Sequence, residues 1–227
     1  MRILIIDNNM MKDSWGCENF RRYARQVPGA TVVVRRAPHD DLPASVDGFD
    51  RILVSGSVTS ANAQAPWIDR MLEFIRRAVD ARKPYLGVCY GHQMLARALG
   101  GGDSVRRADR AEFGWTHIEM TGESPILKGL PKKFYTFSSH EDEVASLPRG
   151  AQIVARSESC AIQSFSLTDA PAFGIQFHPE KDLAECEQSL IRWKKDFKAR
   201  DTLHPDKSKV LYSDEVGEII FRNFFTL

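Results

Sequence analysis

Short apolar runs rich in β-branched residues recur through the first part of the chain and alternate with amphipathic stretches. The runs lie at 3–6, 31–34, 51–54 and 84–88. Their apolarity is continuous rather than alternating, which predicts strands that are covered on both faces. Three stretches with apolar residues at helical spacing lie between or after them, at 17–27, 66–79 and 90–99. Strands that alternate with helices predict an α/β protein with a doubly wound, mostly parallel sheet.

The pattern changes after residue 100. Shorter strands separated by turns are predicted at 115–120, 134–137, 152–155, 161–165 and 172–177. Because no Pro/Gly/Ser linker precedes them, we expect an antiparallel extension and the last strands of the same sheet. Two amphipathic helices follow at 182–198 and 213–225, joined by a polar, mobile loop at 200–209. We therefore expect one domain over 1–227, with a core to about residue 182 and a helical extension over 183–227.

Composition narrows the functional classes. The chain has 227 residues, 43% of them hydrophobic, which is enough for a core without a disulfide or metal staple. Its 31 Lys and Arg residues against 30 Asp and Glu residues leave a net charge of +1, which argues against nucleic-acid or membrane partners. The four cysteines form no C-x-x-C pattern, and the amino terminus does not have the pattern of a signal peptide. These features predict a cytoplasmic protein.

The segment 84–96 contains the strongest chemical signal. Cys89 follows a predicted buried strand and precedes a predicted helix, with Gly87 two residues before it and Gly91 two residues after it. A chain that reverses this sharply brings strand and helix backbones together, so glycines are needed on both sides. The helix N-terminus also favours thiolate over thiol. We expect Cys89 to be an exposed, acidic nucleophile; the alternative is a buried cysteine at an ordinary glycine-rich turn.

A thiolate that attacks a carbonyl needs an imidazole as base and an acceptor that orients the imidazole. His178 ends a predicted strand and is followed, after Pro179, by Glu180. Histidine and glutamate on the same side of this turn can share a hydrogen bond that fixes the tautomer. The alternative is a strand-end turn with a solvated acid. Four other histidines are predicted to pack or to lie at the surface: His92 in the elbow helix, and His39, His117 and His204 outside it.

With these two motifs the chain resembles the class I, triad-type glutamine amidotransferases. The resemblance rests on 87–93 and 173–180, with weaker matches over about residues 1–182. Some of the weaker matches look like the glutaminase domain of GMP synthases; they lie at 112–115, 124–125, 129–131 and 139–144. The resemblance implies a flavodoxin-like sheet and a glutaminase site with Cys89 as nucleophile, His178 as base and Glu180 as the residue that orients it.

The resemblance also implies how such a site works. Cys89 attacks the side-chain amide of glutamine, ammonia leaves, and water hydrolyses the resulting γ-glutamyl thioester. The oxyanion formed on the way needs two backbone donors already aimed at it. Tyr90 N–H follows the nucleophile directly, and Gly56 N–H corresponds to the family's second donor. Three further residues match positions that bind the substrate: Gln93, Ser139 and His140.

The residues around Gly56 depart from the commonest family pattern. Ser55 and Ser57 stand where many synthetase-linked members have Gly-Gly-Pro. Ser-Gly-Ser looks more like a stand-alone branch that includes γ-glutamyl peptidases. The chain also has no S-G-G-x-D-S loop for ATP, so an ammonia acceptor would belong to a separate synthetase. Three functions stay open: a glutamine amidohydrolase or amidotransferase, a γ-glutamyl peptidase with the same triad, and a catalytically silent binding module, against which the intact triad argues.

Two polar segments need no ligand to explain them. The run 106–110 contains three arginines, but the negative charge of Asp109 offsets part of their positive charge. Such a run is typical of a solvated face rather than an anion or partner site. Without the resemblance, 138–143 is typical of a solvated loop. Consecutive residues such as 140–143 rarely converge on one ion, so we predict no metal, and no cofactor is implied.

Overall fold

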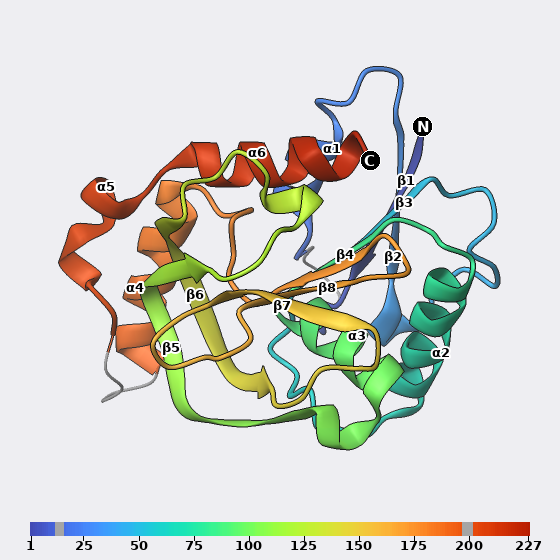
Figure 1. Ribbon diagram of the computed structural model, residues 1–227, viewed down its shortest axis with the longest axis horizontal. Helices are drawn as coiled ribbons and strands as arrows, with labels where there is room; N and C mark the ends of the chain where they lie inside the picture. Colours follow the sequence, from blue (N-terminus) through green and yellow to red (C-terminus); the bar gives the residue numbers. More distant parts are fainter. Residues whose placement is uncertain (12–15, 197–201) are drawn as a thin grey trace.

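The computed structural model describes residues 1–11, 16–196 and 202–227, and its strands form one nine-stranded sheet (Figure 1). The strand order is β2-β1-β3-β4-β9-β8-β7-β5-β6. The first five strands in this order are parallel: β2 (Thr31–Arg36), β1 (Arg2–Asp7), β3 (Arg51–Val54), β4 (Tyr85–Val88) and β9 (Ala172–Ile175). The predicted doubly wound parallel half is confirmed.

The other four strands form an antiparallel extension, as predicted, but three of them are longer than expected. They are β8 (Ser164–Leu167), β7 (Ala151–Arg156), β5 (Val105–Met120) and β6 (Lys133–Val144). β5 begins at Val105 rather than at residue 115, and β6 continues to Val144 rather than ending at 137. The interpretation of 138–143 as a loop is therefore wrong: these residues belong to β6, which pairs with β5.

Helices cover both faces of the parallel half (Figure 1). On one face, α2 (Pro66–Asp80) and α3 (Tyr90–Gly100) share a core with Leu4 and Ile6 of β1. On the other, α1 (Glu18–Ala24) and α6 (Asp214–Phe225) share a core with Ile3 and Ile5. Neighbouring residues of one strand thus enter different cores, which explains why these strands are apolar at every position.

The C-terminal part packs on the same sheet. Cys186 and Leu190 of α4 (Leu183–Asp196) meet aromatic residues of β5 and β6 in a third apolar cluster. Residues 197–198 of the predicted helix lie outside the described residues. Residues 200–201 of the expected loop also lie outside the described residues. The rest is not simply a loop: Leu203 bridges to Gly114 of β5, and η4 (Pro205–Lys207) and α5 (Ser208–Leu211) follow.

Short 3₁₀ turns complete the connections at η1 (Ala37–His39), η2 (Gly102–Ser104) and η3 (Pro125–Leu127). Within the described ranges, none of the helices has the length and apolarity needed to cross a bilayer. The carboxyl ends of β3, β4 and β9 lie side by side in the sheet, and this is where the three segments of interest begin.

Candidate active site

Cys89 occupies a strained turn between β4 and α3. Its backbone has φ +52° and ψ −103°, a left-handed conformation that a side chain adopts only when the surroundings enforce it. A Cβ on Gly87 would lie 2.3 Å from the Gly91 carbonyl carbon, and one on Gly91 would lie 2.5 Å from the Val54 oxygen. Both contacts are with backbone, which cannot move aside. The steric argument for the two glycines is confirmed.

The expectation that Cys89 is exposed is wrong, since the residue is only 5% exposed. The reason is that β6 and the loop after β3 pack over the turn: Cys89 Sγ lies 3.7 Å from the Ser139 carbonyl oxygen, and a Cβ on Gly56 would lie 3.6 Å from Cys89 Cβ. Cys89 nevertheless borders a cavity of about 360 Å³. This volume lies within the range of small-molecule sites, roughly 300–1,000 Å³.

His178 and Glu180 form a buried pair beside Cys89. The distance from His178 Nδ1 to Glu180 Oε1 is 2.6 Å, and a Cβ on Gly56 would lie 3.1 Å from His178 Cε1. Burial alone would lower the pKa of His178, but the Glu180 carboxylate and the Cys89 sulfur outweigh it and raise that pKa to about 9. The imidazole is therefore held protonated near neutral pH. The structure brings the cysteine, the histidine and the glycine loop together.

Residues of α1 hold the turn that carries Glu180. Arg22 Nη2 donates to the Glu180 carbonyl oxygen at 2.7 Å and Arg22 Nη1 to Asp182 Oδ2 at 3.0 Å. The Tyr23 hydroxyl donates to the Pro179 carbonyl oxygen at 3.5 Å. These contacts span more than 150 positions along the chain, and no local pattern in the sequence signals them.

The two predicted oxyanion donors flank the turn. Tyr90 is the first residue of α3, so its N–H has no acceptor within the helix. Gly56 belongs to a loop that its two serines fasten to the end of β1. Ser55 Oγ accepts from Asn8 N–H and donates to the Gly56 carbonyl oxygen, both at 2.9 Å, and Ser57 Oγ donates to the Asn8 carbonyl oxygen at 2.9 Å. The serines that depart from the commoner family pattern thus brace the loop.

Gln93, Ser139 and His140 all line the cavity that Cys89 borders. Gln93 Nε2 donates to the Asp142 carbonyl oxygen at 2.7 Å and to Gln176 Oε1 at 3.0 Å, so its amino group is engaged by the protein. The two ring nitrogens of His140 lie 3.0 Å from Glu112 Oε2 and 3.1 Å from the Asp142 carbonyl oxygen. Contact with the substrate stays a prediction for all three residues.

Glu112 is the centre of a buried polar network that sequence reasoning did not identify as a site feature. Besides His140, its carboxylate accepts from three side chains, those of Ser157, Ser159 and Gln163. Burial would raise the pKa of Glu112, but these donors and His140 hold it below its ordinary value. The partners come from β6 and from the segment between β7 and β8, and only the fold brings them together.

The remaining histidines lie apart from this chemistry. His92 is fully buried against Phe165, with ring centroids 5.0 Å apart, and burial lowers its pKa to about 3, so it packs as a neutral ring. His117 and His204 are exposed, as predicted. His39 is half-buried, with Nε2 at 3.2 Å from the Asn9 carbonyl oxygen.

The side chains of 140–143 diverge instead of converging. Glu141 pairs with Arg107, Asp142 accepts from Ser60, and Glu143 pairs with Arg106. In the part of the chain that the structure describes, no group of three or more His, Cys, Asp or Glu residues is arranged to hold a metal ion.

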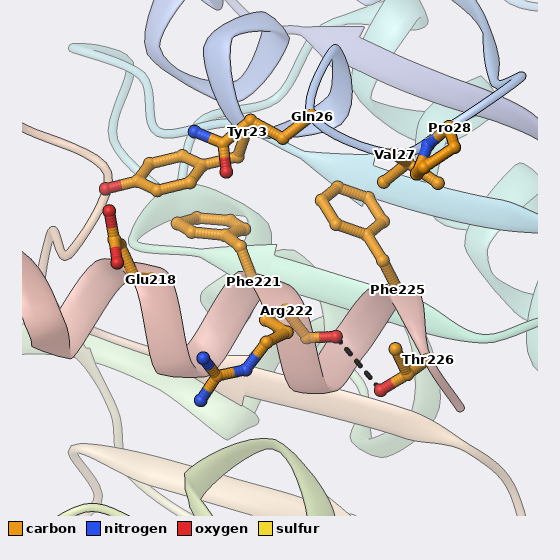
Figure 2. A pocket seen from close by; sticks show the side chains of 9 residues that line it. All are labelled: Tyr23, Gln26, Val27, Pro28, Glu218, Phe221, Arg222, Phe225 and Thr226. Carbon is orange, nitrogen blue, oxygen red and sulfur yellow. Dashed lines mark hydrogen bonds between the residues drawn. The ribbon is translucent and has the colours of Figure 1, made fainter.

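A second cavity, of about 320 Å³, lies between the end of α1 and α6 (Figure 2). Aromatic rings dominate it: Tyr23 and Phe221 stack with centroids 4.3 Å apart, and Phe225 lines the same hollow. Glu218 and Arg222 supply its charges, and none of its lining residues is a cysteine or histidine. The chemistry of the first cavity, not this one, fits a nucleophilic reaction.

The fold and the first cavity together define a class of protein: a doubly wound α/β sheet with a cysteine at a strand-to-helix elbow and a histidine–glutamate pair after the neighbouring strand. The particular family follows from comparison with known proteins. The model of the family described as glutamine amidotransferase class-I matches residues 11–196, so the chain belongs to that family. The family assignment drawn from the two motifs is confirmed.

Individual relatives support the assignment to this family. Over 109 residues the chain is 41% identical to a glutamine-hydrolyzing GMP synthase subunit of Pyrococcus abyssi, covering 48% of this chain and 57% of that protein. It is 37% identical over 127 residues to the subunit of the same name from Methanocaldococcus jannaschii, covering 56% and 66%. The chain thus spans between about half and two thirds of these relatives' length. A solved glutamine amidotransferase of Thermotoga maritima shares the fold, with a TM-score of 0.79 and 24% identity over 99% of this chain and 96% of that one.

Proposed function

We propose that the protein hydrolyses the side-chain amide of glutamine to glutamate and ammonia. The observation that carries this proposal is the convergence of Cys89, the His178–Glu180 pair and the Gly56 loop at the elbow, where Cys89 and Ser57 also line a cavity. Membership in the amidotransferase family and the names of the relatives support the choice of glutamine.

In the first half of the reaction, the Cys89 thiolate attacks the carbonyl carbon of the side-chain amide. A sulfur–carbon bond forms while the carbonyl electrons move onto oxygen, where Tyr90 N–H and Gly56 N–H stabilise the charge. His178, which Glu180 keeps protonated, transfers its proton to the amide nitrogen. The carbon–nitrogen bond then breaks, ammonia leaves, and a γ-glutamyl thioester remains on Cys89.

In the second half, water replaces ammonia. His178 is now neutral and accepts a proton from the water as it attacks the thioester carbon. The sulfur–carbon bond breaks, glutamate leaves, and the thiolate–imidazolium pair is restored. Glu180 keeps the imidazole in one orientation through both halves, because its bond to Nδ1 leaves the other ring nitrogen for proton transfer.

We further propose that the ammonia is passed to a separate synthetase subunit in the cytosol. Relatives named as subunits of a glutamine-hydrolyzing GMP synthase support a partner of that kind. The four cysteines are all free, and a thiolate nucleophile needs a reducing compartment to stay reduced.

A second candidate function is hydrolysis of γ-glutamyl peptides with the same residues. The Ser55-Gly56-Ser57 loop favours it, because this loop resembles that of stand-alone peptidases. The two functions differ in the leaving group, an ammonia or an α-amine, and therefore in the space needed beyond the scissile bond.

The test is an assay of purified protein for ammonia and glutamate release from L-glutamine, beside L-γ-glutamylglycine as the competing substrate. Cys89→Ala is expected to abolish both activities, whereas Cys17→Ala, at a buried cysteine that does not line the cavity, is expected to retain them. A larger kcat/KM for the dipeptide favours the second candidate. No release from either substrate, with and without a synthetase subunit, contradicts both.

A further inference from the structure

The backbone of the turn from His178 to Glu180 is held by groups that lie outside the turn. Proline fixes φ at residue 179, so the direction of the Glu180 side chain depends on the two planar peptide groups that flank its Cα. The carbonyl oxygen of one group belongs to Pro179 and that of the other to Glu180. Contacts with these two oxygens therefore determine where the Glu180 carboxylate lies relative to His178 Nδ1.

Helix α1 binds both oxygens. Arg22 Nη2 donates to the Glu180 carbonyl oxygen at 2.7 Å, and the Tyr23 hydroxyl donates to the Pro179 carbonyl oxygen at 3.5 Å. Arg22 is itself held in place, because Nη1 donates to Asp182 Oδ2 at 3.0 Å and the guanidinium lies 5.4 Å from the centre of the Tyr23 ring. Two neighbouring residues of one helix thus fix both peptide groups beside Glu180.

Helix α6 packs against the same contact. A Cβ on Gly217 would lie 2.3 Å from the Tyr23 hydroxyl oxygen and 2.4 Å from the Pro179 carbonyl oxygen. Phe221, one turn further along, stacks on the Tyr23 ring with centroids 4.3 Å apart (Figure 2). Glycine is less favourable than alanine inside a helix, and this close approach of α6 to the turn is the packing reason for it here.

Resting on the proposed function, we propose that Arg22 and Gly217 are positioning residues for amide hydrolysis: they fix the backbone beside Glu180 and so direct its carboxylate at His178. Neither residue lines the cavity beside Cys89, so both act through the turn. Gly217 belongs to α6, which begins at Asp214, whereas the match to the family model ends at residue 196. A helix beyond the matched residues thus contributes to the candidate active site.

A small displacement of the turn is enough to affect the reaction. His178 Nδ1 and Glu180 Oε1 lie 2.6 Å apart, which is typical of a strong, charge-assisted hydrogen bond that requires correct geometry. Misplacing a catalytic group by about 1 Å costs about 10²-fold in rate. Neither His178 nor Glu180 lines the cavity. A loss of positioning is therefore expected in kcat and not in KM.

The first experiment measures the steady-state kinetics of glutamine hydrolysis. Gly217→Ala adds a Cβ that must displace the Pro179 carbonyl group, so we expect kcat to fall by about 10- to 100-fold with KM within about twofold. The loss should persist in the double variant Tyr23→Phe/Gly217→Ala, where the hydroxyl is gone but the contact with the carbonyl oxygen remains. Gly102→Ala is the matched control and should match wild type, because a Cβ there meets nothing within 4 Å.

Arg22 is tested in the same assay. Arg22→Met is expected to lower kcat by about 10-fold, and Arg22→Lys should recover part of the loss, because an ammonium group supplies a donor without the planar fork. Arg21→Met is the control: the neighbouring arginine pairs with Glu18 of the same helix, and the variant should match wild type. The side chain of Arg22 is 41% exposed, so the Arg22 variants carry the test if Gly217→Ala does not fold.

A second readout needs no turnover. Titration of His178 by NMR, with its signal assigned from His178→Gln, reports whether the carboxylate still faces the ring. Gly217→Ala changes no charge, so the pKa of His178 should fall below the wild-type value of about 9 because Glu180 has moved. Arg22→Met removes a cation, which by itself would raise this pKa; a fall therefore reports displacement of Glu180. Both variants keep the other charged groups near the turn, which are Lys181, Asp182 and Glu185.

Where wild type turns glutamine over, a lower kcat together with a lower pKa of His178 supports these roles. Either change alone, or a loss confined to KM, overturns the inference. A wild type that releases no ammonia from glutamine and does not cleave L-γ-glutamylglycine rejects the proposed reaction instead. The titration then decides: a lowered pKa in Gly217→Ala and Arg22→Met keeps the positioning of Glu180, and an unchanged pKa overturns it.

Discussion

His178 Nδ1 lies 2.6 Å from Glu180 Oε1, although the two residues are separated by only Pro179 and both are buried. The proline turn folds the glutamate back beside the histidine, and Arg22 holds that turn through the Glu180 carbonyl oxygen. The carboxylate and the Cys89 sulfur overcome the effect of burial and raise the pKa of His178 to about 9. A buried carboxylate thus keeps a proton on the imidazole where the proposed reaction needs one.

Glu180→Gln is expected to lower kcat by about 10²- to 10⁴-fold. The amide keeps the shape of the carboxylate, but it no longer stabilises the imidazolium or fixes the tautomer of the neutral imidazole. Without the carboxylate, the pKa of His178 should fall, so the alkaline limb of the pH–rate profile should move to lower pH. Steady-state kinetics from about pH 6 to about pH 10 measure both effects. Glu73→Gln, at an exposed position on α2, is the control and should leave the profile unchanged. An unchanged profile in Glu180→Gln would contradict the assigned role.

The same interaction predicts how stability depends on pH. The pKa of His178 is raised from 6.5 to about 9 on folding, so the folded state binds the proton more tightly than the unfolded state. The resulting stabilisation is complete below about pH 6.5, declines as the pH rises, and is lost above about pH 9. Urea unfolding at fixed ionic strength across this range should show a steeper loss in wild type than in His178→Gln. Parallel slopes for the two proteins would show that the pKa of His178 is not raised.

The elbow glycines predict a sharp contrast between two substitutions of the same kind. A Cβ at Gly87 would meet the Gly91 carbonyl carbon at 2.3 Å, whereas a Cβ at Gly102 would meet nothing within 4 Å. Gly87→Ala should therefore lower the free energy of unfolding by about 1–3 kcal/mol or more and impair activity, since strand or helix must shift. Gly102→Ala should be nearly neutral. Urea denaturation of the two variants checks this, and equal effects would argue that the elbow is looser than these distances indicate.

The elbow and the histidine–glutamate turn were open to prediction because their constraints are local. Gly87, Cys89 and Gly91 lie within five residues, and the steric requirement that links them acts between adjacent backbones. His178 and Glu180 are likewise close in sequence. The parallel strands could be predicted for a related reason: each is buried on both faces, so its own composition marks it.

The features missed from the sequence depend on partners far along the chain. The first half of β5 is exposed and charged at 106–110, and it pairs with β6 only up to Arg107 before the pairing resumes at Glu112. Residues 202–209 of the expected loop contact Gly114 and Trp115 of β5: Leu203 bridges to Gly114, and Trp115 Nε1 donates to Ser208 Oγ at 2.9 Å. No local sequence pattern at 202–208 indicates that this segment contacts β5. The burial of Cys89 was missed likewise, because Ser139 covers it from another strand.

The brace on the Gly56 loop can be tested at Ser55. Its hydroxyl links Asn8 N–H to the Gly56 carbonyl oxygen, and Ser55→Ala removes both bonds without adding bulk. The Gly56 N–H should then be less well aimed, and we expect kcat to fall by about 10- to 100-fold, less than the ~10²–10³ for losing a donor outright. KM should change little. Ser45→Ala, at an exposed position, is the control. A wild-type kcat in Ser55→Ala would mean that Gly56 is positioned without the hydroxyl.

The Glu112 network predicts a stability defect with a particular pH dependence. Its carboxylate accepts from His140, Ser157, Ser159 and Gln163, so Glu112→Gln places an amino group among donors and leaves buried groups unpaired. We expect a loss of about 1–3 kcal/mol in the free energy of unfolding. Glu119→Gln, which alters a partly exposed carboxylate paired with Arg156, should cost less.

The pH dependence separates lost charge from lost packing at Glu112. The folded pKa of Glu112 is lowered, so its contribution is present above the ordinary carboxylate pKa and is lost as the pH falls through the folded value. The gap in stability between wild type and Glu112→Gln should therefore narrow on acidification, because wild type loses a contribution that the variant never had. Urea unfolding of both proteins between neutral and acidic pH measures the gap. A constant gap would assign the defect to packing alone and would contradict an ionised Glu112 in the folded protein.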